Sequence, residues 1–467
     1  MQNPWLAYAI DRNAATPVFE QICARLRADI VDGRLAEGSR LPATRNFATE
    51  LGVSRSTIVT AYDQLQAEGY ITGRGGSGYT VCPLGDVELT SADVAPAPDD
   101  LPPPAPGPVP VFTPGQPDMR LFPYTQWAKT VARVCRTTPE AMLTGGTMQG
   151  NFALRQAIAR HLSEWRGIEA SAHQVIVTAG SGDALEICLR TLLRAGEGIG
   201  LEDPGYQALY HFADGQRLPV SPLGRDSYGT SLPRDPARTT LAVLTPSHQF
   251  PLGGAMSPGR RMEYIQWAAD NDCWIIEDDY DSEFRYAGRP IPALAGFDRL
   301  RRTLYVGSFS KIFSNSLRLG YVVIPEALRP AFDDTLARYG IKASFMPQQA
   351  LAEFINRGEF YRHLRRVRRI YGERRRLLIA LLDRHFADLG RFEDHQAGMQ
   401  IAWHLPPGLP DREIAARARA AGLGAQPLSA YCRERRDMNG LLLGFCGFTE
   451  EELAAGMAKM RENEILG

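Results

Sequence analysis

The chain has 467 residues, too many for one hydrophobic core, so two or three domains are expected. A net charge of −1 excludes a global attraction to nucleic acid or to a membrane surface, and a hydrophobic content of 44% is typical of a globular protein. Seven scattered cysteines without ligand spacing argue against a metal site, and the absence of a signal peptide or long apolar run predicts a cytoplasmic protein.

Residues 1–82 predict a small helical domain that ends in a hairpin. Apolar residues recur at helical spacing after Thr16-Pro17, a second short helix starts near Thr44, and Ser54 is placed to cap a third. Two short β-runs then flank a glycine-rich tip at 73–78. This order predicts a winged helix-turn-helix, in which the start of the third helix faces DNA.

The predicted DNA surface depends on this pattern rather than on charge. Residues 1–82 contain eight Arg and eight acidic residues, so the domain has no basic excess. A small domain that only mediates protein contacts therefore stays the alternative. The hydroxyls and arginines expected at bases or phosphates, together with the wing, are Arg45, Ser54, Arg55, Ser56, Thr57, Thr60, Arg74 and Gly76.

A proline-rich segment follows at 83–111. It contains nine Pro among Ala, Asp and Gly and has no apolar period, so it cannot bury a core. At about 3.1 Å per residue, an extended segment of this length reaches at most roughly 85 Å. We interpret it as a linker, long enough to place the small domain on a neighbouring subunit.

From residue 112 to 467, short apolar strands alternate with helices, which predicts a mostly parallel sheet covered on both faces. Ligands of such sheets bind where strands end. Ser181-Gly182 opens a helix after the strand at 174–178 and is a candidate for binding a phosphate; a simple capped helix is the alternative. Tyr206 and His248-Gln249 follow later strands, and the tyrosine could stack on a planar ring.

A run of acids, Glu277-Asp278-Asp279, ends in Tyr280 after an apolar strand. Acids at the end of a buried strand are costly unless they are paired. A carboxylate there could keep a pyridinium nitrogen protonated, while the phenol meets a ring hydroxyl. The alternative is an Asp that caps a helix.

Lys311 is one of only four lysines, and it lies in a small-residue loop between two apolar strands. A desolvated amine can condense with an aldehyde to a Schiff base, which a guanidinium cannot do. Ser308, Ser310 and Arg318 are close enough in sequence to hold a phosphate. We interpret Lys311 as the anchor of pyridoxal 5′-phosphate (PLP); a solvated loop lysine is the alternative.

Two resemblances follow from these motifs. The segment from Leu41-Pro-Ala-Thr-Arg to Gly78-Tyr-Thr-Val81 resembles the GntR-type winged helix, and the ordered motifs around Lys311 resemble α/β PLP-dependent transferases of aspartate aminotransferase fold type I. The whole chain resembles MocR/GabR-type transcriptional regulators. The resemblance implies that Lys311 forms the Schiff base, Asp278 pairs with the ring nitrogen, Tyr280 meets the ring oxygen and Tyr206 stacks on the ring. It implies that the phosphate is held by Ser181, Gly182, Ser308, Ser310 and Arg318, with His248 and Gln249 nearby.

The resemblance further implies a regulator rather than an enzyme. Its partners would be operator DNA and an amine or amino-acid effector that displaces Lys311 to form an external aldimine, and its assembly a head-to-tail homodimer with exchanged winged helices. A genuine aminotransferase with an accessory DNA-binding domain, and a regulator that senses PLP itself, stay open as alternatives.

Several positions depart from the family pattern. Gly182-Asp183 stands where Gln-Gln is frequent, Leu252 where Thr is usual, Gln400 where His is common, and Ala208 where one member has a carboxylate-binding Arg. Three C-terminal arginines are candidates for an effector anion or for plain solvated charge: Arg433, Arg435 and Arg436. The basic run at 360–376 predicts a long helix with Leu364, Val367 and Tyr371 buried and its arginines outside, with a DNA contact as the alternative.

Overall fold

The computed structural model describes residues 8, 10–12, 14–74, 78–84, 107–140, 146–462 and 465–466. Contacts divide the chain into two compact units, residues 1–105 and 106–467, which are described separately. The division falls within the segment 83–111 that the sequence assigns to a linker, and most of that segment lies outside the described residues.

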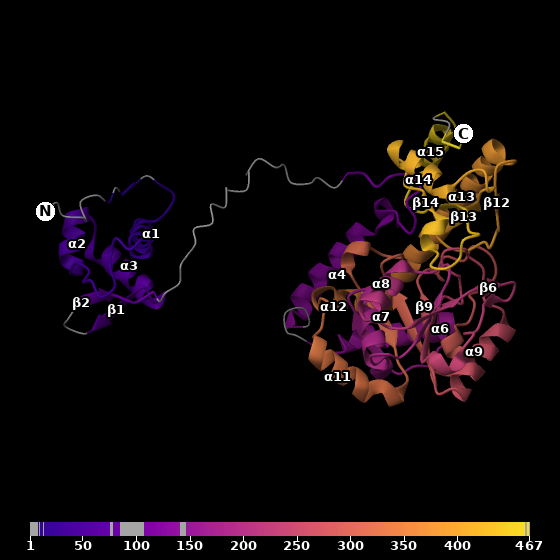
Figure 1. Ribbon diagram of the computed structural model, residues 1–467, viewed down its shortest axis with the longest axis horizontal. Helices are drawn as coiled ribbons and strands as arrows, with labels where there is room; N and C mark the ends of the chain where they lie inside the picture. Colours follow the sequence, from indigo (N-terminus) through magenta and orange to yellow (C-terminus); the bar gives the residue numbers. More distant parts are fainter. Residues whose placement is uncertain are drawn as a thin grey trace. The chain divides into compact units, whose positions relative to one another are not determined.

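The small unit is a three-helix domain with a two-stranded antiparallel hairpin (Figure 1). Its buried core comes from the inner faces that the apolar spacing predicts, among them Ile22 and Leu26 of the first helix and Ile58 and Leu65 of the third. Ser54 caps the third helix as predicted, since its side chain accepts a hydrogen bond from the Thr57 amide. The elements are α1 (Val18–Val31), α2 (Thr44–Leu51), α3 (Arg55–Ala67), β1 (Ile71–Arg74) and β2 (Gly78–Val81).

The large unit is built on a seven-stranded sheet (Figure 1). Its strands are parallel except one, which lies antiparallel to both of its neighbours and comes directly after the Lys311 loop. In spatial order they are β3 (Val175–Thr178), β11 (Gly320–Val323), β10 (Thr303–Ser308), β9 (Trp274–Asp279), β8 (Leu241–Leu244), β4 (Ile199–Glu202) and β5 (Val220–Leu223). The mostly parallel α/β sheet expected from the sequence is confirmed.

Both faces of this sheet are covered by helices. Alternate residues of one strand enter different cores: Val177 joins the cluster with α6, α12 and α13, whereas Ile176 joins the cluster with α7, α8 and α11. The helices are α4 (Tyr124–Thr137), α6 (Phe152–Arg166), α7 (Ser181–Leu192), α8 (Gln207–Gly215), α9 (Pro258–Asp270), α10 (Leu294–Asp298), α11 (Arg329–Tyr339) and α12 (Met346–Asn356). A small hairpin, β6 (Arg225–Asp226) and β7 (Gly229–Thr230), lies beyond β5.

The C-terminal part forms a smaller antiparallel sheet that begins beyond the long helix α13 (Glu359–Phe386). Its elements are β12 (Arg391–Phe392), β13 (Gln400–His404), α14 (Asp411–Ala420), β14 (Gln426–Pro427), β15 (Gly440–Gly444) and α15 (Glu450–Glu462). We call this part the C-terminal subdomain.

Helix α13 contains the basic run, with Leu364, Val367 and Tyr371 buried as predicted. The expectation that its arginines all lie outside is wrong for two of them. Arg374 and Arg375 are buried, and they form ion pairs with Asp118 and Asp394 respectively. Buried guanidinium groups need such partners, so these two positions stabilise the fold rather than extend a solvated face.

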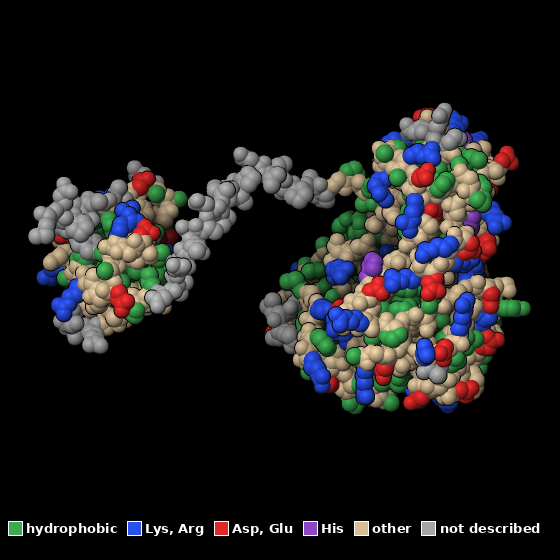
Figure 2. Space-filling view, viewed as in Figure 1, with side chains coloured by type: hydrophobic (Ala, Val, Ile, Leu, Met, Phe, Trp, Pro, Cys, Tyr) green, Lys and Arg blue, Asp and Glu red, His purple; other side chains and the backbone are tan. Residues whose placement is uncertain are grey.

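Charges of both signs are interspersed over the visible face of the large unit (Figure 2). Within the described ranges, no helix is both long and apolar enough to cross a membrane. No group of three or more metal-binding side chains converges in the part of the chain that the structure describes.

Candidate functional site

The Lys311 side chain is largely buried and lies at the end of β10, where the sequence places it. Its Nζ donates to the Gly115 carbonyl oxygen at 2.7 Å. Gly115 has φ +68°, and a side chain there would meet the lysine nitrogen, since an added Cβ would lie 2.9 Å from it. Burial lowers the pKa of Lys311, with Asp281 acting in the opposite direction. A lowered pKa provides more of the neutral, nucleophilic amine at a given pH.

The acidic side chains of strand β9 point alternately to opposite faces of the sheet. Glu277 and Asp279 face the same side, where Arg166 lies 3.9 Å from the first and 2.8 Å from the second. Tyr305 also donates to Asp279, at 2.6 Å. Asp278 faces the opposite side, because successive strand residues alternate. No helix follows β9 directly, so Asp278 and Asp279 do not cap one. Glu277 does, because its Oε2 accepts from the Ala295 amide in the first turn of α10 (Leu294–Asp298), at 2.9 Å.

Asp278 is a buried carboxyl without compensation. Its Oδ1 has no hydrogen-bond partner among the described residues. Burial, reinforced by Asp279, Glu202 and Asp281, raises the pKa of Asp278 to about 7. A buried unpaired carboxylate is costly, so this atom fits a donor that the protein itself does not supply. A pyridinium N–H of PLP has the required chemistry.

The predicted phosphate residues converge at the start of α7. Its first turn, from Ser181, has free backbone N–H groups, because the preceding Gly180 provides no side-chain cap. The Arg318 guanidinium carbon lies 4.0 Å from the position of a Cβ added at Gly180. The Ser308 hydroxyl accepts from the Ser310 amide at 3.1 Å. These groups fit a phosphate, although Gly182 offers only its backbone.

Asp183, the acid that departs from the family pattern, is held by groups of the protein itself and so need not repel an anion at this helix end. Its Oδ2 accepts from the Ala179 amide at 2.8 Å, and its Oδ1 lies 3.5 Å from Lys342 Nζ. The carboxylate is therefore neutralised locally, which is compatible with a phosphate at the same helix end.

Tyr206 lies where a ring-stacking residue is expected. Burial raises the pKa of its phenol, Asp278 adds to the rise and Arg318 opposes it, so both charged groups are near enough to act on the tyrosine. Phe250 packs edge-on against it, with ring centroids 6.3 Å apart. Tyr206 keeps 45% of its surface exposed, which leaves a face for a ligand.

His248 and Tyr280 form a linked pair with an acid that the sequence interpretation did not assign. His248 Nδ1 lies 3.0 Å from the Tyr280 hydroxyl and 3.0 Å from both carboxylate oxygens of Asp281. Asp281 also acts electrostatically on Lys311. The His248–Asp281 pair therefore positions the phenol that the ring oxygen would meet.

Gln249 positions a loop. Its side-chain amide donates to the Pro204 and Phe250 carbonyls and accepts from the Leu252 amide. These bonds fix the turn before Tyr206 and leave the side chain without a free donor for a cofactor. A direct cofactor role for Gln249 is therefore not supported by its contacts.

Other residues of the site were missed at the sequence level. Gly115 follows a proline, and only its left-handed backbone hints at a close approach. Arg166 lies 145 positions before Lys311, at the end of α6, so no local pattern connects it with β9. Asp281 is visible as one more acid after the run, but its partner His248 is 33 positions away.

Two of the three C-terminal arginines proposed for an effector anion already pair with carboxylates. Arg433 pairs with Asp214 at 2.9 Å, and Arg435 pairs with Asp437 at 2.8 Å. Arg436 is exposed.

In the small domain, most of the predicted DNA residues are exposed. Arg45, Ser54, Arg55, Ser56 and Thr60 are exposed at α2 and α3, and Thr57 is half-buried. The four hydroxyls also form hydrogen bonds within the domain: Ser54 Oγ lies 2.7 Å from Ser56 Oγ and 2.8 Å from Thr57 Oγ1, Ser54 caps α3, and Thr60 donates to the Ser56 carbonyl. Gly76 and the side chain of Arg74 lie outside the described residues.

Comparison with known proteins identifies relatives of each domain and of the whole chain. The model of the family "Bacterial regulatory proteins, gntR family" matches residues 19–81, and that of "Aminotransferase class I and II" matches residues 115–420. The probable rhizopine catabolism regulatory protein MocR of Rhizobium meliloti is 36% identical over 97% of this chain and 94% of its own. The pyridoxine biosynthesis transcriptional regulator PdxR of Corynebacterium glutamicum is 31% identical over 99% of both.

Among solved structures, the multiple substrate aminotransferase of Thermococcus profundus matches with a TM-score of 0.68 and 25% identity, over 76% of this chain and 91% of that one. An archaeal alanine:glyoxylate aminotransferase matches with a TM-score of 0.70 at 22% identity, over 76% of this chain and 90% of that one, which shows the fold. Fold and site thus define a winged-helix regulator whose second domain has the aminotransferase fold type I.

The chain belongs to the MocR/GabR-type transcriptional regulators of the GntR superfamily. The family predicted from the sequence and the predicted fold class are both confirmed.

Proposed function

We propose that the aminotransferase-like domain binds PLP at Lys311 and that this regulator senses a primary amine or amino acid there. The observation that carries the proposal is the uncompensated carboxyl of Asp278 on β9, the strand next to β10, which leads into the loop of the largely buried Lys311. When bound, PLP supplies an aldehyde carbon at which Lys311 and an incoming amine can exchange.

The protein's own residues have separate tasks in this proposal. Asp278 accepts the ring N–H, and Tyr280, held by His248, donates toward the ring oxygen. Tyr206 covers one face of the ring. The phosphate is held by Ser181, Gly182, Ser308, Ser310 and Arg318.

The burial of Lys311 keeps part of its amine neutral, which favours exchange with another amine. An effector changes DNA binding only if it binds two arrangements of the protein with different affinity. Operator contact is assigned to Arg45, Arg55, Ser56 and Thr57, the exposed or half-buried residues around the start of α3. We further propose that two chains form a head-to-tail homodimer, as the resemblance to this family implies.

The test begins with the purified full-length protein reconstituted with PLP. Borohydride reduction followed by peptide mass spectrometry should give an adduct on the peptide that contains Lys311, and Lys311→Ala should give none. Amines are then screened for a change in absorbance. A hit must also shift the affinity for DNA fragments selected from a random library. A protein that yields no adduct at Lys311 contradicts the proposal.

A second candidate is a regulator that senses PLP itself. The printed name of PdxR, a relative 31% identical to this chain, describes control of pyridoxine biosynthesis. Titration of the PLP-free protein with PLP alone separates the two: DNA affinity that responds fully without any amine favours PLP sensing. Sustained conversion of an amino acid and a 2-oxo acid would instead identify an aminotransferase.

A further inference from the structure

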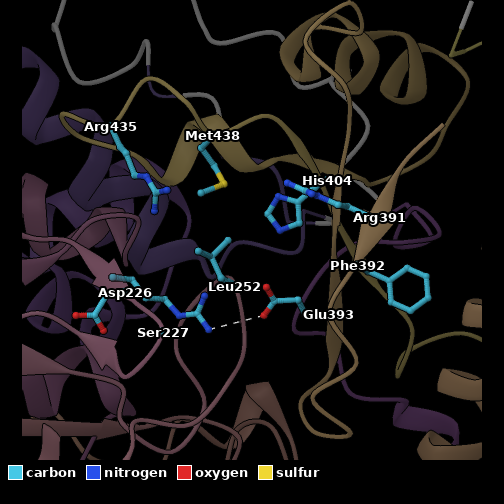
Figure 3. A pocket seen from close by; sticks show the side chains of 10 residues that line it. Asp226, Ser227, Leu252, Arg391, Phe392, Glu393, His404, Arg435 and Met438 are labelled. Carbon is cyan, nitrogen blue, oxygen red and sulfur yellow. Dashed lines mark ion pairs between the residues drawn. The ribbon is translucent and has the colours of Figure 1, made fainter. Parts of the chain in front are cut away.

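A second cavity lies between the large sheet domain and the C-terminal subdomain. It has a volume of about 630 Å³. Arg225 of β6 and Leu252 contribute one wall, and Arg391, His404 and Arg435 contribute the other. In Figure 3, Arg435, Met438 and His404 point toward Leu252 and Glu393, and Arg391 extends from β12 toward His404. We call this space the Arg cleft.

The interior of the Arg cleft is cationic. Asp226 points away from the centre in Figure 3, and its carboxylate pairs with Arg260 at 2.7 Å. Glu393 points inward, but it is mostly exposed and lies 3.9 Å from Arg225, so this ion pair is loose. Arg435 pairs with Asp437 at 2.8 Å, but Asp437 is not among the residues that line the cleft. Arg391 has no ion-pair partner in the described part of the chain.

His404 and the three arginines line the same cavity, and the charges of the arginines act on the His404 ring. Its pKa is lowered first by burial, and Arg391, Arg225 and Arg435 then oppose a further positive charge, while Glu393 acts the other way. Three guanidinium groups from both walls therefore act on the same small volume, where an anion would be stabilised.

The floor of the Arg cleft is apolar. Leu252 and Met438 belong to one buried cluster with Ala402, Leu428 and Leu442. A ligand that fits both surfaces combines carboxylates with a short hydrocarbon chain. The arginines lie on opposite walls, so two carboxylates match them better than one does.

The Arg cleft is separate from the Lys311 site. A smaller space of about 20 Å³, lined by His248, Gly253 and His395 among others, adjoins it. Lys311 lines neither space, so a ligand of the Arg cleft need not touch the amine of Lys311.

The partition between the two sites is nevertheless thin. A Cβ added at Gly254 would lie 2.8 Å from the Arg225 guanidinium, and one added at Gly253 would lie 2.5 Å from the His395 ring and 3.2 Å from His248. An anion that draws in Arg225 therefore acts on a turn that also touches His248, the partner of Tyr280.

We propose that the Arg cleft is a second ligand site, which binds a small organic dicarboxylate between Arg225 on the large domain and Arg391 and Arg435 on the C-terminal subdomain. The bound anion joins the two parts of the large unit. This site does not depend on PLP chemistry at Lys311.

The test is calorimetric titration of the full-length protein with glutarate, with the neutral diamide of glutarate as the control ligand. Glutarate should bind and the diamide should not. Arg391→Gln, an exposed position that the fold tolerates, should weaken binding roughly tenfold, as the loss of a hydrogen bond to a charged group predicts. Arg225→Gln should act similarly, and Arg338→Gln on α11 is the matched control that changes nothing.

Two further variants complete the test. Glu393→Gln should tighten binding, because it removes the acid that competes for Arg225. Lys311→Ala should bind glutarate as the wild type does, which separates this proposal from the one on amine sensing. Glutarate binding that is absent, equal in Arg391→Gln, not tightened in Glu393→Gln or lost in Lys311→Ala overturns the proposal.

Discussion

Replacing Asp278 with Asn should stabilise the PLP-free protein while it weakens PLP binding. The buried carboxyl has no partner for its Oδ1 among the described residues, and its pKa is raised to about 7 by burial first and by nearby acids second. An amide of the same shape removes the buried charge but cannot accept a ring N–H as a carboxylate does. Stability and cofactor affinity are therefore expected to change in opposite directions.

The size of the expected change in stability follows from the linkage between proton binding and folding. The pKa of Asp278 is higher in the folded protein than in the unfolded chain, so the folded protein binds the extra proton and its free energy of unfolding falls as the pH rises from about 4 to about 7. A rise from 3.8 to about 7 corresponds to about 4 kcal/mol at pH 8. Below pH 4 the carboxyl is protonated in both states and the difference disappears.

The assay is urea unfolding of PLP-free wild type and Asp278→Asn between pH 4 and pH 8, followed by circular dichroism. The variant should gain several kcal/mol at pH 8 and about nothing at pH 4, because this window lies between the two pKa values. PLP titration monitored by absorbance should show weaker binding to the variant. A stability difference that is absent at pH 8, or that does not vary with pH, refutes the account of an uncompensated carboxyl.

Three other substitutions test the helix cap of α3, the DNA contact and the buried ion pair of α13. Ser54→Ala should cost the small domain about 1 kcal/mol in thermal unfolding, because the cap of α3 is lost; an unchanged midpoint would exclude that role. Arg55→Ala should weaken selected DNA by about 1–3 kcal/mol without changing binding to random DNA, if the side chain contacts a base. Arg374→Gln should lower the free energy of unfolding by about 3 kcal/mol by leaving Asp118 short of a buried partner, whereas exposed Arg369→Gln should change it by less than about 0.5 kcal/mol.

Much of the fold could be predicted because its signals are local. The short apolar runs at 241–244 and 303–306 each form a strand of the seven-stranded sheet. Ser54 indicates the start of α3, because a serine side chain can accept a hydrogen bond from an amide of the first helical turn. The burial of Arg374 and Arg375 could not be predicted, because their partners Asp118 and Asp394 come from distant segments.

The residues of the candidate site likewise fall into those that could be predicted from the sequence and those that could not. Lys311 and Asp278 stand out in sequence, since each is a costly group beside a buried strand. Part of their surroundings does not: Gly115 and Arg166 reach this site only through tertiary packing, 196 and 145 positions away from Lys311. A residue whose role is to position another leaves little local pattern, which is why the sequence places Gln249 near the cofactor but does not show the loop contacts that occupy its side chain.

The loop that carries Tyr206 is also the loop that holds the C-terminal subdomain. The Asp203 carboxylate accepts from the amides of residues 433, 434 and 435, at 2.8, 2.8 and 3.1 Å, and the Gly205 amide donates to the Tyr431 carbonyl at 2.9 Å. Tyr431 also packs edge-on against Phe250, which packs in turn against Tyr280. Because rigid hydrogen bonds join these segments directly, a ligand that displaces Tyr206 or Tyr280 acts on the C-terminal subdomain without a long chain of intermediates. Occupancy of the site is therefore coupled to the position of the C-terminal subdomain, as a sensor requires; enzymes that close over a substrate use the same kind of coupling.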